Sequence, residues 1–208
     1  MKVEIDEEYR NKIIEKITKI RRRSGYHVTD LIFCLRKKYF EVKGVDAKRN
    51  HRIAIAGLLG TSLHMGIEYG ELFTEVRAER NGIVGTVDMI DGEYVVDFKT
   101  TRGPPEPREH WIYQLMAYCY LFNKEKARLV IFQVIRPEVV VYKFEFENPE
   151  ICKLWSTLVA RKSYLDYCIK NNRVPDIDIA LMFDWECKNC PYKEVCRNDL
   201  RKSSVSEN

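Results

Sequence analysis

The sequence lacks several features that would place it in a specialised class of protein. No run of about 18 apolar residues occurs, so no segment is expected to cross a membrane. The segment that begins at Met1 has no apolar stretch like that of a secretory signal peptide, and no internal repeat is visible. Glutamine is nearly absent, with only Gln114 and Gln133, while 32% of the residues are charged, a mixture typical of proteins from thermophiles. We therefore expect a cytoplasmic globular protein.

The composition also gives no reason to expect a disulfide-based scaffold. The chain has 208 residues, of which 45% are hydrophobic, enough for the core of one domain. Its seven cysteines are therefore expected to be metal ligands or small buried residues rather than disulfide partners.

Positive charge is concentrated in the first quarter of the chain. Residues 1–52 hold fifteen Lys and Arg against eight Asp and Glu, a net charge of +7, whereas the rest holds twenty against twenty-three, a net charge of −3. The basic residues form three runs, Arg21 to Arg23, Arg36 to Lys38, and Lys48 with Arg49. This distribution suits a lobe that binds a polyanion such as nucleic acid, although a solvated helix face has the same pattern.

Hydrophobic periodicity and turn residues divide the chain into helices and strands. Helical spacing predicts helices over about 3–22, 29–42, 53–73, 109–122 and 149–171. Alternation predicts strands over about 73–80, 83–90, 93–100, 128–136 and 139–146. Asn81-Gly82 and Asp91-Gly92 supply the positive φ of two-residue hairpin turns, so the first three strands are expected to form an antiparallel meander. The order predicts an α/β or α+β domain with a mixed central sheet flanked by helices.

One hairpin of this meander brings two carboxylates and a lysine to one face. With a two-residue turn at Asp91-Gly92, Asp88 pairs with Val95, and Asp97 and Lys99 follow on the same face. The two carboxylates are then diagonal neighbours about 7–8 Å apart at the backbone, close enough to converge on one cation. Carboxylates among apolar residues are costly to bury unpaired, and a lysine beside them can stabilise charge on a phosphate. The alternative is a strand-surface ion pair of Asp97 with Lys99.

Two predicted helices carry further polar candidates. His64 lies in the third predicted helix, where it is either an imidazole ligand for the carboxylate site or a structural histidine. Gln114 and Tyr118 lie at i and i+4 on the helix after the meander. Their side chains can hydrogen-bond a substrate phosphate or hold the lysine, or else belong to a partly buried helix face.

Three cysteines form a closely spaced group near the C-terminus. Cys187, Cys190 and Cys196 have the spacing C-x2-C-x5-C in a segment without core periodicity, which usually indicates a metal. A fourth ligand is required, and the choices are Cys34, Cys119, Cys152 and Cys168. The last three lie in or beside helical core positions and are expected to be small buried residues. Structural zinc fits this spacing as well as an iron–sulfur cluster does.

The hairpin and helix residues together resemble the RecB-type branch of the PD-(D/E)XK nucleases. The resemblance rests on His64, Gly85-Thr86-Val87-Asp88, Asp97-Phe98-Lys99 and Gln114-x-x-x-Tyr118. It implies that Mn²⁺ or Mg²⁺ is held by His64, Asp88, Asp97 and the carbonyl of Phe98. It also implies that Lys99 is catalytic, and the candidate catalytic set is Asp88, Asp97, Lys99, Gln114 and Tyr118. The second acid of this branch is often glutamate and is aspartate here.

The upstream cysteine makes the resemblance more specific. Cys34, the RecB-type core and the C-terminal cysteine group resemble the iron-staple nucleases, and the compact size is similar to the fourth family of CRISPR-associated exonucleases, over about residues 30 to 197. The resemblance implies an iron–sulfur cluster, usually 4Fe–4S but also 2Fe–2S, held by Cys34, Cys187, Cys190 and Cys196. It implies a nuclease for single-stranded or frayed DNA that trims prespacers with the CRISPR integrase proteins as partners. Tyr39, Phe40 and Tyr118 are candidates to stack on bases, although aromatics at helical spacing usually belong to a core.

The expected organisation is one nuclease domain over residues 1–202. It comprises a basic helical lobe (1–60), a PD-(D/E)XK core (61–171) and a C-terminal iron–sulfur segment (174–200), followed by a disordered tail (203–208). Two other functions fit the sequence. One is the same module in archaeal or viral recombination or replication, and the other is a zinc-stapled DNA-binding module with a decayed metal site. The joint presence of His64, Asp88, Asp97 and Lys99 argues against decay.

Overall fold

The fold is described from a computed structural model of the chain. The backbone is described for residues 6–18, 23–47, 50–69 and 75–205, and within these ranges the side chains of residues 64, 67–69 and 200–205 are left out. The helices are α1 (Glu7–Thr18), α2 (Val28–Ile32), α3 (Leu35–Val42), α4 (His51–Tyr69), α5 (Glu109–Phe122), α6 (Asn148–Lys170), α7 (Ile177–Ala180), the 3-10 helix η1 (Asp184–Asn189) and α8 (Lys193–Val205). The strands are β1 (Tyr26–His27), β2 (Val76–Arg80), β3 (Ile83–Val87), β4 (Met89–Asp91), β5 (Tyr94–Thr101), β6 (Lys126–Gln133) and β7 (Glu138–Glu145).

The strands form two mixed sheets, so the predicted α+β class with mixed pairing is confirmed. One sheet has the order β1-β3-β2, with β1 parallel and β2 antiparallel to β3. The other has the order β4-β5-β6-β7, in which only β5 and β6 are parallel. The parallel pair is joined by α5, and such a crossover lays the connecting helix against the sheet. This β5-α5-β6 unit carries most of the candidate site.

The prediction of one three-stranded meander is wrong, because the chain changes sheet at Asp88. The hairpin of β2 and β3 turns at Asn81 and Gly82, both with positive φ, as expected. The second hairpin belongs to the other sheet, since β3 ends at Val87 and β4 begins at Met89.

The predicted register of the second hairpin is also wrong, by two residues. Asp91 pairs with Tyr94 as the last residue of β4, and Gly92, with φ 58°, takes the first turn position, which suits a turn with glycine there. Because Met89 pairs with Val96, the same register carried one step further sets Asp88 directly opposite Asp97. A two-residue shift preserves the face of every side chain, so the predicted shared face of Asp88, Asp97 and Lys99 survives the correction.

The single helix predicted over 29–42 is two helices. α2 ends at Ile32, Phe33 is extended with ψ 179°, and Cys34 is the N-cap of α3. The interruption turns the backbone of Cys34 towards the C-terminal segment, where its N–H donates to the buried carboxylate of Glu186. The apolar periodicity is continuous across this break and gives no signal of it.

Other helices differ mainly at their ends. α5 has the predicted bounds, and α6 begins and ends one residue before the predicted ones. α1 is shorter than predicted and has no buried residue, with Tyr9 and Ile13 exposed. The C-terminal segment, which has no core periodicity in the sequence, contains η1 and α8, and α8 overlaps the first three residues predicted as a tail.

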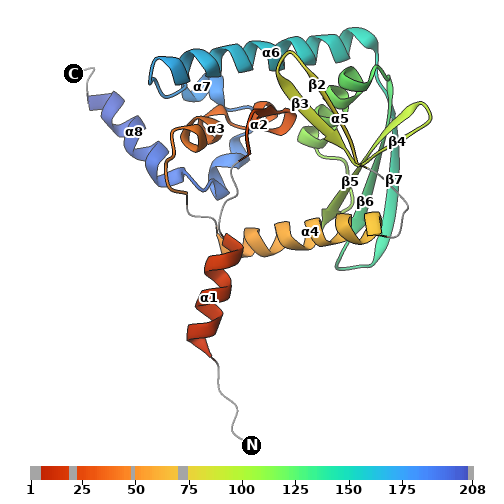
Figure 1. The fold of residues 1–208 in the computed structure, drawn as a ribbon, viewed down its shortest axis with the longest axis horizontal. Helices are drawn as coiled ribbons and strands as arrows, with labels where there is room; N and C mark the ends of the chain where they lie inside the picture. Colours follow the sequence, from red (N-terminus) through yellow and green to blue (C-terminus); the bar gives the residue numbers. More distant parts are fainter. Residues whose placement is uncertain (1–5, 19–22, 48–49, 70–74, 206–208) are drawn as a thin grey trace, which may run out of the picture.

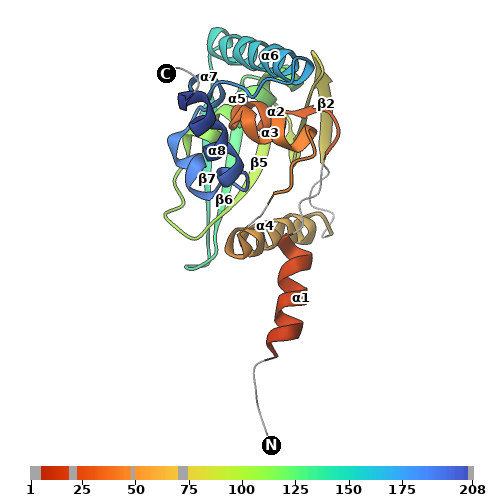
Figure 2. The same ribbon diagram turned by 90° about the vertical axis from the view of Figure 1, so that its left-hand side faces the viewer.

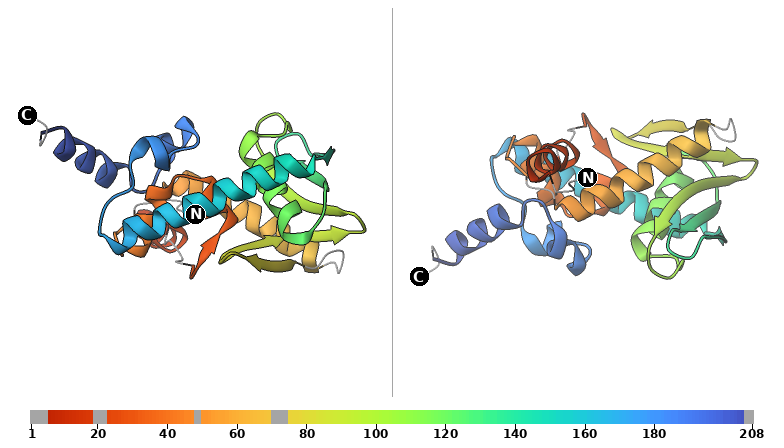
Figure 3. Two further views of the ribbon diagram at one scale, coloured as in Figure 1. Left: turned by 90° about the horizontal axis from the view of Figure 1, so that it is seen from above. Right: turned by 90° about the horizontal axis from the view of Figure 1, so that it is seen from below.

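The helices α2, α3, α7 and α8 gather at one end of the molecule and the strands β2 to β7 at the other, with β1 beside α2 (Figures 1 and 3). The long helix α6 crosses both parts, packing against α5 as well as α2 and α3. α4 lies along the opposite side and contacts β5, whereas α1 points away from the body of the molecule (Figures 1 and 2). No helix in the described ranges is long and apolar enough to cross a membrane.

Candidate active site

Asp97 and Lys99 lie together on β5, in the interior of the four-stranded sheet. The Nζ of Lys99 is 2.5 Å from the Oδ2 of Asp97. The Asp97 side chain is 5% exposed and that of Lys99 19% exposed, so the aspartate is enclosed while the lysine reaches the surface. An ion pair with one buried partner is not the solvated surface pair that was the alternative interpretation of this motif.

Asp88 occupies the residue between β3 and β4. Its Oδ2 accepts a hydrogen bond of 2.6 Å from the backbone N–H of Phe98, which fixes the carboxylate beside β5. In an extended strand the N–H and C=O of one residue point to the same edge. The carbonyl of Phe98 is therefore directed to the edge on which Asp88 lies. The structure thus brings together Asp88, Asp97, Phe98 and Lys99.

Gly85 allows α5 to approach β3 closely. A Cβ at this position would lie 2.3 Å from Cδ1 of Leu121 and 3.1 Å from the ring of Tyr118. Only glycine permits this contact, which seats Tyr118 beside the two carboxylates.

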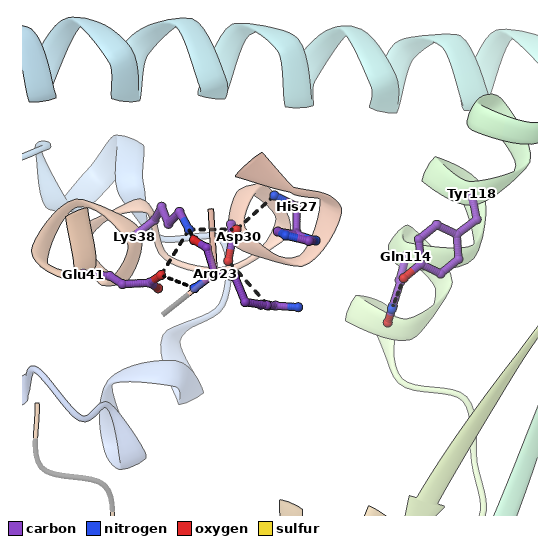
Figure 4. Close-up of polar contacts among 7 residues, drawn as sticks. All are labelled: Arg23, His27, Asp30, Lys38, Glu41, Gln114 and Tyr118. Atoms are coloured by element: carbon purple, nitrogen blue, oxygen red, sulfur yellow. Dashed lines mark hydrogen bonds and ion pairs between the residues drawn. The ribbon is translucent and has the colours of Figure 1, made fainter. Parts of the chain in front are cut away.

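Tyr118 and Gln114 form one hydrogen-bonded pair on α5, as the i, i+4 spacing suggested. The Nε2 of Gln114 donates to the hydroxyl of Tyr118 at 2.6 Å (Figure 4). Burial, followed by the negative charge of Asp97, raises the pKa of Tyr118, so its hydroxyl stays protonated. A protonated phenol beside two carboxylates can donate a hydrogen bond but carries no charge of its own.

The backbone of His64 lies on α4, but its side chain falls outside the described part of the structure. One turn earlier on the same helix, a Cβ at Gly60 would lie 3.3 Å from Oγ1 of Thr100, the residue after Lys99. The helix backbone therefore passes close to β5 near the carboxylate site. Where the His64 imidazole points stays a prediction.

The donor set on this face fits a hard divalent cation. Two aspartates and one carbonyl are oxygen ligands of the kind that Mg²⁺ and Mn²⁺ prefer. Two carboxylates on facing strand positions repel each other in a buried environment, and a cation between them removes that cost. Among side chains in the described ranges, no three of His, Cys, Asp or Glu are grouped closely enough to hold a metal ion. On this face, the described acidic ligands are therefore the two aspartates, Asp88 and Asp97.

The four predicted cluster cysteines line one cavity. Cys34, Cys187, Cys190 and Cys196 border a space of about 300 Å³ between α3, η1 and α8. The other three cysteines lie elsewhere: Cys119 and Cys168 are buried, and Cys152 is exposed on α6. Burial raises the pKa of Cys34 to about 11, so this thiol is neutral in the absence of a metal. The four cysteines come from two ends of the chain, and among the described side chains no three of them are grouped closely enough to hold one metal ion.

Comparison with known proteins identifies the family. The family model of the PD-(D/E)XK nuclease superfamily matches residues 15–197.

The chain belongs to the PD-(D/E)XK nuclease superfamily.

Its relatives include the CRISPR-associated exonuclease Cas4 of Saccharolobus solfataricus, which is 25% identical and covers 90% of this chain and 94% of its own. The crystal structure of SSO0001 matches with a TM-score of 0.56 and 24% identity over 90% of this nuclease and 93% of that chain. The alkaline exonuclease LHK-Exo from Laribacter hongkongensis has a TM-score of 0.55 and 13% identity over 71% of this nuclease and 91% of its own chain. The two structures support the fold, and the predicted resemblance to the Cas4 exonucleases is confirmed.

Sequence reasoning missed Arg161, which ties the two ends of this nuclease together. This arginine of α6 is 9% exposed, and burial lowers the pKa of its guanidinium from its ordinary value. Its guanidinium donates to four backbone carbonyls from two distant segments, those of Leu31, Phe33, Ile179 and Ala180, at 2.7–3.0 Å. A polar residue in the stripe of a long helix looks like any surface arginine, so no local signal marks it.

Glu186 and Arg36 make further links beside the cysteine cavity. The Oε2 of Glu186 accepts from the N–H of Cys34 at 3.0 Å and from Nζ of Lys37 at 2.8 Å. Arg36 donates to the carbonyl of Pro175 at 2.7 Å and to Sγ of Cys196 at 3.2 Å. The cavity is therefore framed by charged hydrogen bonds as well as by cysteines.

These contacts revise the interpretation of the basic N-terminal segment. Arg36 and Lys38 are only 5% and 4% exposed, so they are not part of a surface that binds a polyanion. Figure 4 shows Lys38 directed to Asp30 and Glu41, which lie 3.4 and 3.2 Å from its Nζ. Lys37 remains partly exposed. Of the other two runs, Arg21, Arg22, Lys48 and Arg49 lie outside the described residues, whereas Arg23 is 58% exposed and lies 3.8 Å from Asp30.

The predicted stacking residues are also revised. Tyr39, Phe40 and Tyr118 are 5%, 4% and 5% exposed, so none offers a free ring face to a base. Their helical spacing reflects the core, which was the alternative.

Proposed function

We propose that the protein is a divalent-cation-dependent deoxyribonuclease that hydrolyses phosphodiester bonds at the face formed by Asp88, Asp97 and Lys99. The observation that carries this proposal is the 2.5 Å contact of a lysine with an enclosed aspartate, opposite a second aspartate fixed to the same strand. Membership of the nuclease superfamily supports it.

Each residue of this face has a distinct role in the proposal. Asp88, Asp97, the carbonyl of Phe98 and His64 would hold Mg²⁺ or Mn²⁺. When bound, the cation supplies a Lewis acid that polarises the scissile phosphate. Lys99 is partly exposed, so its ammonium can turn from Asp97 to a phosphate oxygen and stabilise the negative charge that develops there. The phenol of Tyr118, oriented by Gln114, can donate to the same phosphate or to Asp97.

The substrate that we propose is single-stranded or end-frayed DNA. Support comes from the Cas4 exonuclease of Saccharolobus solfataricus, whose similarity extends over 90% of this chain, and from a structure of LHK-Exo in complex with dAMP. We extend this to a cytoplasmic role in trimming prespacers for CRISPR adaptation, with the integrase proteins as partners. A nuclease of archaeal or viral recombination or replication has the same chemistry, and the genes that surround its own would separate the two roles.

The cysteine cavity is proposed to hold an iron–sulfur cluster, 4Fe–4S or 2Fe–2S. The four sulfurs and the cavity of about 300 Å³ support this assignment over one zinc ion. In this proposal the segments 1–60 and 174–200 form a lobe that grips the strand, while residues 61–171 perform the hydrolysis. Anaerobically purified protein should contain iron and acid-labile sulfide, whereas one equivalent of zinc without iron would favour the zinc-stapled alternative.

An end-labelled oligonucleotide tests the proposed activity. The protein is incubated with single-stranded or blunt duplex DNA in the presence of Mn²⁺, Mg²⁺ or a chelator. We expect cleavage of the single strand with either ion and none with the chelator. Tight binding without cleavage under every condition would instead support a DNA-binding module whose metal site has decayed.

A further inference from the structure

Three aromatic side chains from distant parts of the chain meet at one partly exposed place. Phe33 comes from the break between α2 and α3, His110 from the first turn of α5, and Trp185 from η1. The ring centroids of His110 and Trp185 are 5.0 Å apart, those of Phe33 and His110 5.6 Å, and those of Phe33 and Trp185 6.1 Å. We call these three rings the aromatic platform.

The platform packs against a buried ring on one side and is partly exposed at Trp185. Phe183, which is buried, lies beneath Trp185 with near-parallel rings 5.9 Å apart and also contacts His110. Trp185 itself is 52% exposed, although tryptophan usually buries most of its surface in a soluble protein. About half of the Trp185 side chain is therefore available for contact with another flat ring.

Lys37, Arg108 and Lys99 place positive charge near the platform, and Lys37 is also paired with Glu186. The ammonium of Lys37 lies 5.1 Å from the ring centroid of Phe33. The positive charges of Arg108, Lys99 and Lys37 lower the pKa of His110 further than burial alone, to about 4, and Glu109 opposes them weakly. His110 is therefore a neutral ring near neutral pH. Flat neutral rings among cations are the combination that binds the bases and phosphates of a single strand.

α5 connects the platform to the candidate active site. His110, Gln114 and Tyr118 follow one another at intervals of four residues and therefore share a face of the helix. Two helical turns separate the first from the last, roughly 12 Å along the axis. Lys99, which acts on His110 electrostatically, is also the partner of Asp97. One extended strand can therefore contact the platform while its phosphate lies at Lys99.

We propose that the platform of Phe33, His110 and Trp185 is a base-stacking subsite that holds an unpaired nucleobase of the DNA strand entering the active site. This inference rests on the proposed nuclease function and deepens it, because it states how a single strand is preferred. A base paired in a duplex cannot present its face to the platform, whereas a frayed or unpaired base can. The cysteine-rich segment thereby contributes Trp185 to substrate binding, in addition to any structural role.

Binding is tested on the full chain without added divalent cation, so that hydrolysis does not interfere. Trp185→Leu removes the aromatic face and keeps an apolar side chain, and Trp185→Phe restores a ring. Tyr167→Leu is the matched control, since Tyr167 of α6 is 53% exposed and is not part of the platform. Iron content is measured for each variant because Trp185 is close in sequence to Cys187.

We expect Trp185→Leu to weaken binding of a labelled single strand by roughly 5- to 100-fold, the loss of one base–aromatic stack. Trp185→Phe should recover most of the affinity, and Tyr167→Leu should match the wild type. With Mg²⁺ or Mn²⁺ present, the KM of Trp185→Leu should rise while kcat at saturating strand stays unchanged. A strand with a single 2-aminopurine should show quenched emission at one position, and Trp185→Leu should restore that emission.

Two results would overturn the subsite. One is a Trp185→Leu variant that retains iron and binds the strand as tightly as the wild type. This is also the result expected if the platform binds a protein and not DNA. The other is an equal loss in Tyr167→Leu. Failure of the nuclease proposal is distinguishable: a wild type that binds and stacks the strand without cleaving it would refute the hydrolysis and leave the subsite intact.

Discussion

Asp97 and Lys99 are two residues apart in β5, and every second residue of a strand points to the same face. By contrast, 152 residues separate Cys34 from Glu186, the glutamate that accepts the hydrogen bond of its N–H. The face proposed to be catalytic, formed by Asp88, Asp97 and Lys99, is local in sequence and needs only one strand, its neighbour and one helix. The cysteine cavity is built from the two ends of the chain and depends on buried links such as Arg161. Changes in the first region should therefore affect chemistry with little effect on folding, and changes in the second should affect stability and strand binding.

The largest expected effect comes from removing a carboxylate of the catalytic face. Asp97→Asn should lower the rate of DNA hydrolysis by about 100-fold or more, because a ligand charge and the partner of Lys99 disappear together. The variant should remain folded, since Lys99 can reach solvent. Rates measured on an end-labelled strand, with the melting temperature as control, check this. Asp97→Glu, which keeps a carboxylate, should retain part of the activity, and full activity in Asp97→Asn would remove the residue from the mechanism.

The next largest effect concerns the junction of the two ends. Arg161→Met should lower the free energy of unfolding by at least about 4 kcal/mol, because four carbonyls lose their donor and each buried unsatisfied group costs about 1–3 kcal/mol. Urea unfolding measures the loss. The matched control is Arg173→Met, whose ion pair with Asp176 is 59% exposed on both sides and should change stability by less than about 1 kcal/mol. Equal effects of the two variants would mean that Arg161 does not hold the junction.

A smaller effect is expected from the close contact between β3 and α5. Gly85→Ala should destabilise the protein by about 1–3 kcal/mol, because its methyl group meets Leu121 and Tyr118 and forces them to move. Hydrolysis should fall as well, since Tyr118 lies beside the carboxylates. Gly57→Ala in α4 meets no atom within 4 Å and should be neutral or stabilising in a helix. Thermal melting measures both variants, and equal changes in melting temperature for Gly85→Ala and Gly57→Ala would contradict this account.

The smallest effect is a pH dependence of stability. The pKa of His110 is lowered in the folded protein from its ordinary value of 6.5 to about 4, by burial and then by Arg108, Lys99 and Lys37. The unfolded chain therefore takes up a proton between these two values that the folded protein does not. Stability should fall as the pH is lowered from about 6.5 towards 4. His110→Phe should remove part of this slope in unfolding titrations, and an unchanged slope would show that His110 titrates normally.

The sequence predicted the local region well and the distant one only in outline. Period-two alternation placed Asp88, Asp97 and Lys99 on one face, and even a register error of two residues left that face intact. The grouping of the four cysteines could be predicted from their spacing and from the family resemblance. The hydrogen bonds of Glu186 and Arg36 beside the cavity could not be predicted in that way. Arg161, Glu186 and the aromatic platform depend on tertiary contacts between segments far apart, and the break at Phe33 interrupts no hydrophobic pattern. Buried Arg36 and Lys38 look like surface charge in a sequence, because only their partners reveal that they face inward.

The central claim is that the carboxylate face performs hydrolysis and the cysteine-rich end binds the strand. It is tested most directly by comparing kcat and strand affinity in two variants. Asp97→Asn and Cys190→Ser are assayed on the same single strand with Mn²⁺, and kcat at saturation is expressed per folded molecule, with folding and iron content measured separately. The account predicts that Asp97→Asn binds the strand but hydrolyses it very slowly. It predicts that Cys190→Ser loses iron, stability and strand affinity while its folded fraction keeps the wild-type kcat. A folded Cys190→Ser variant with a greatly reduced kcat, or an Asp97→Asn variant with the wild-type kcat, would contradict it.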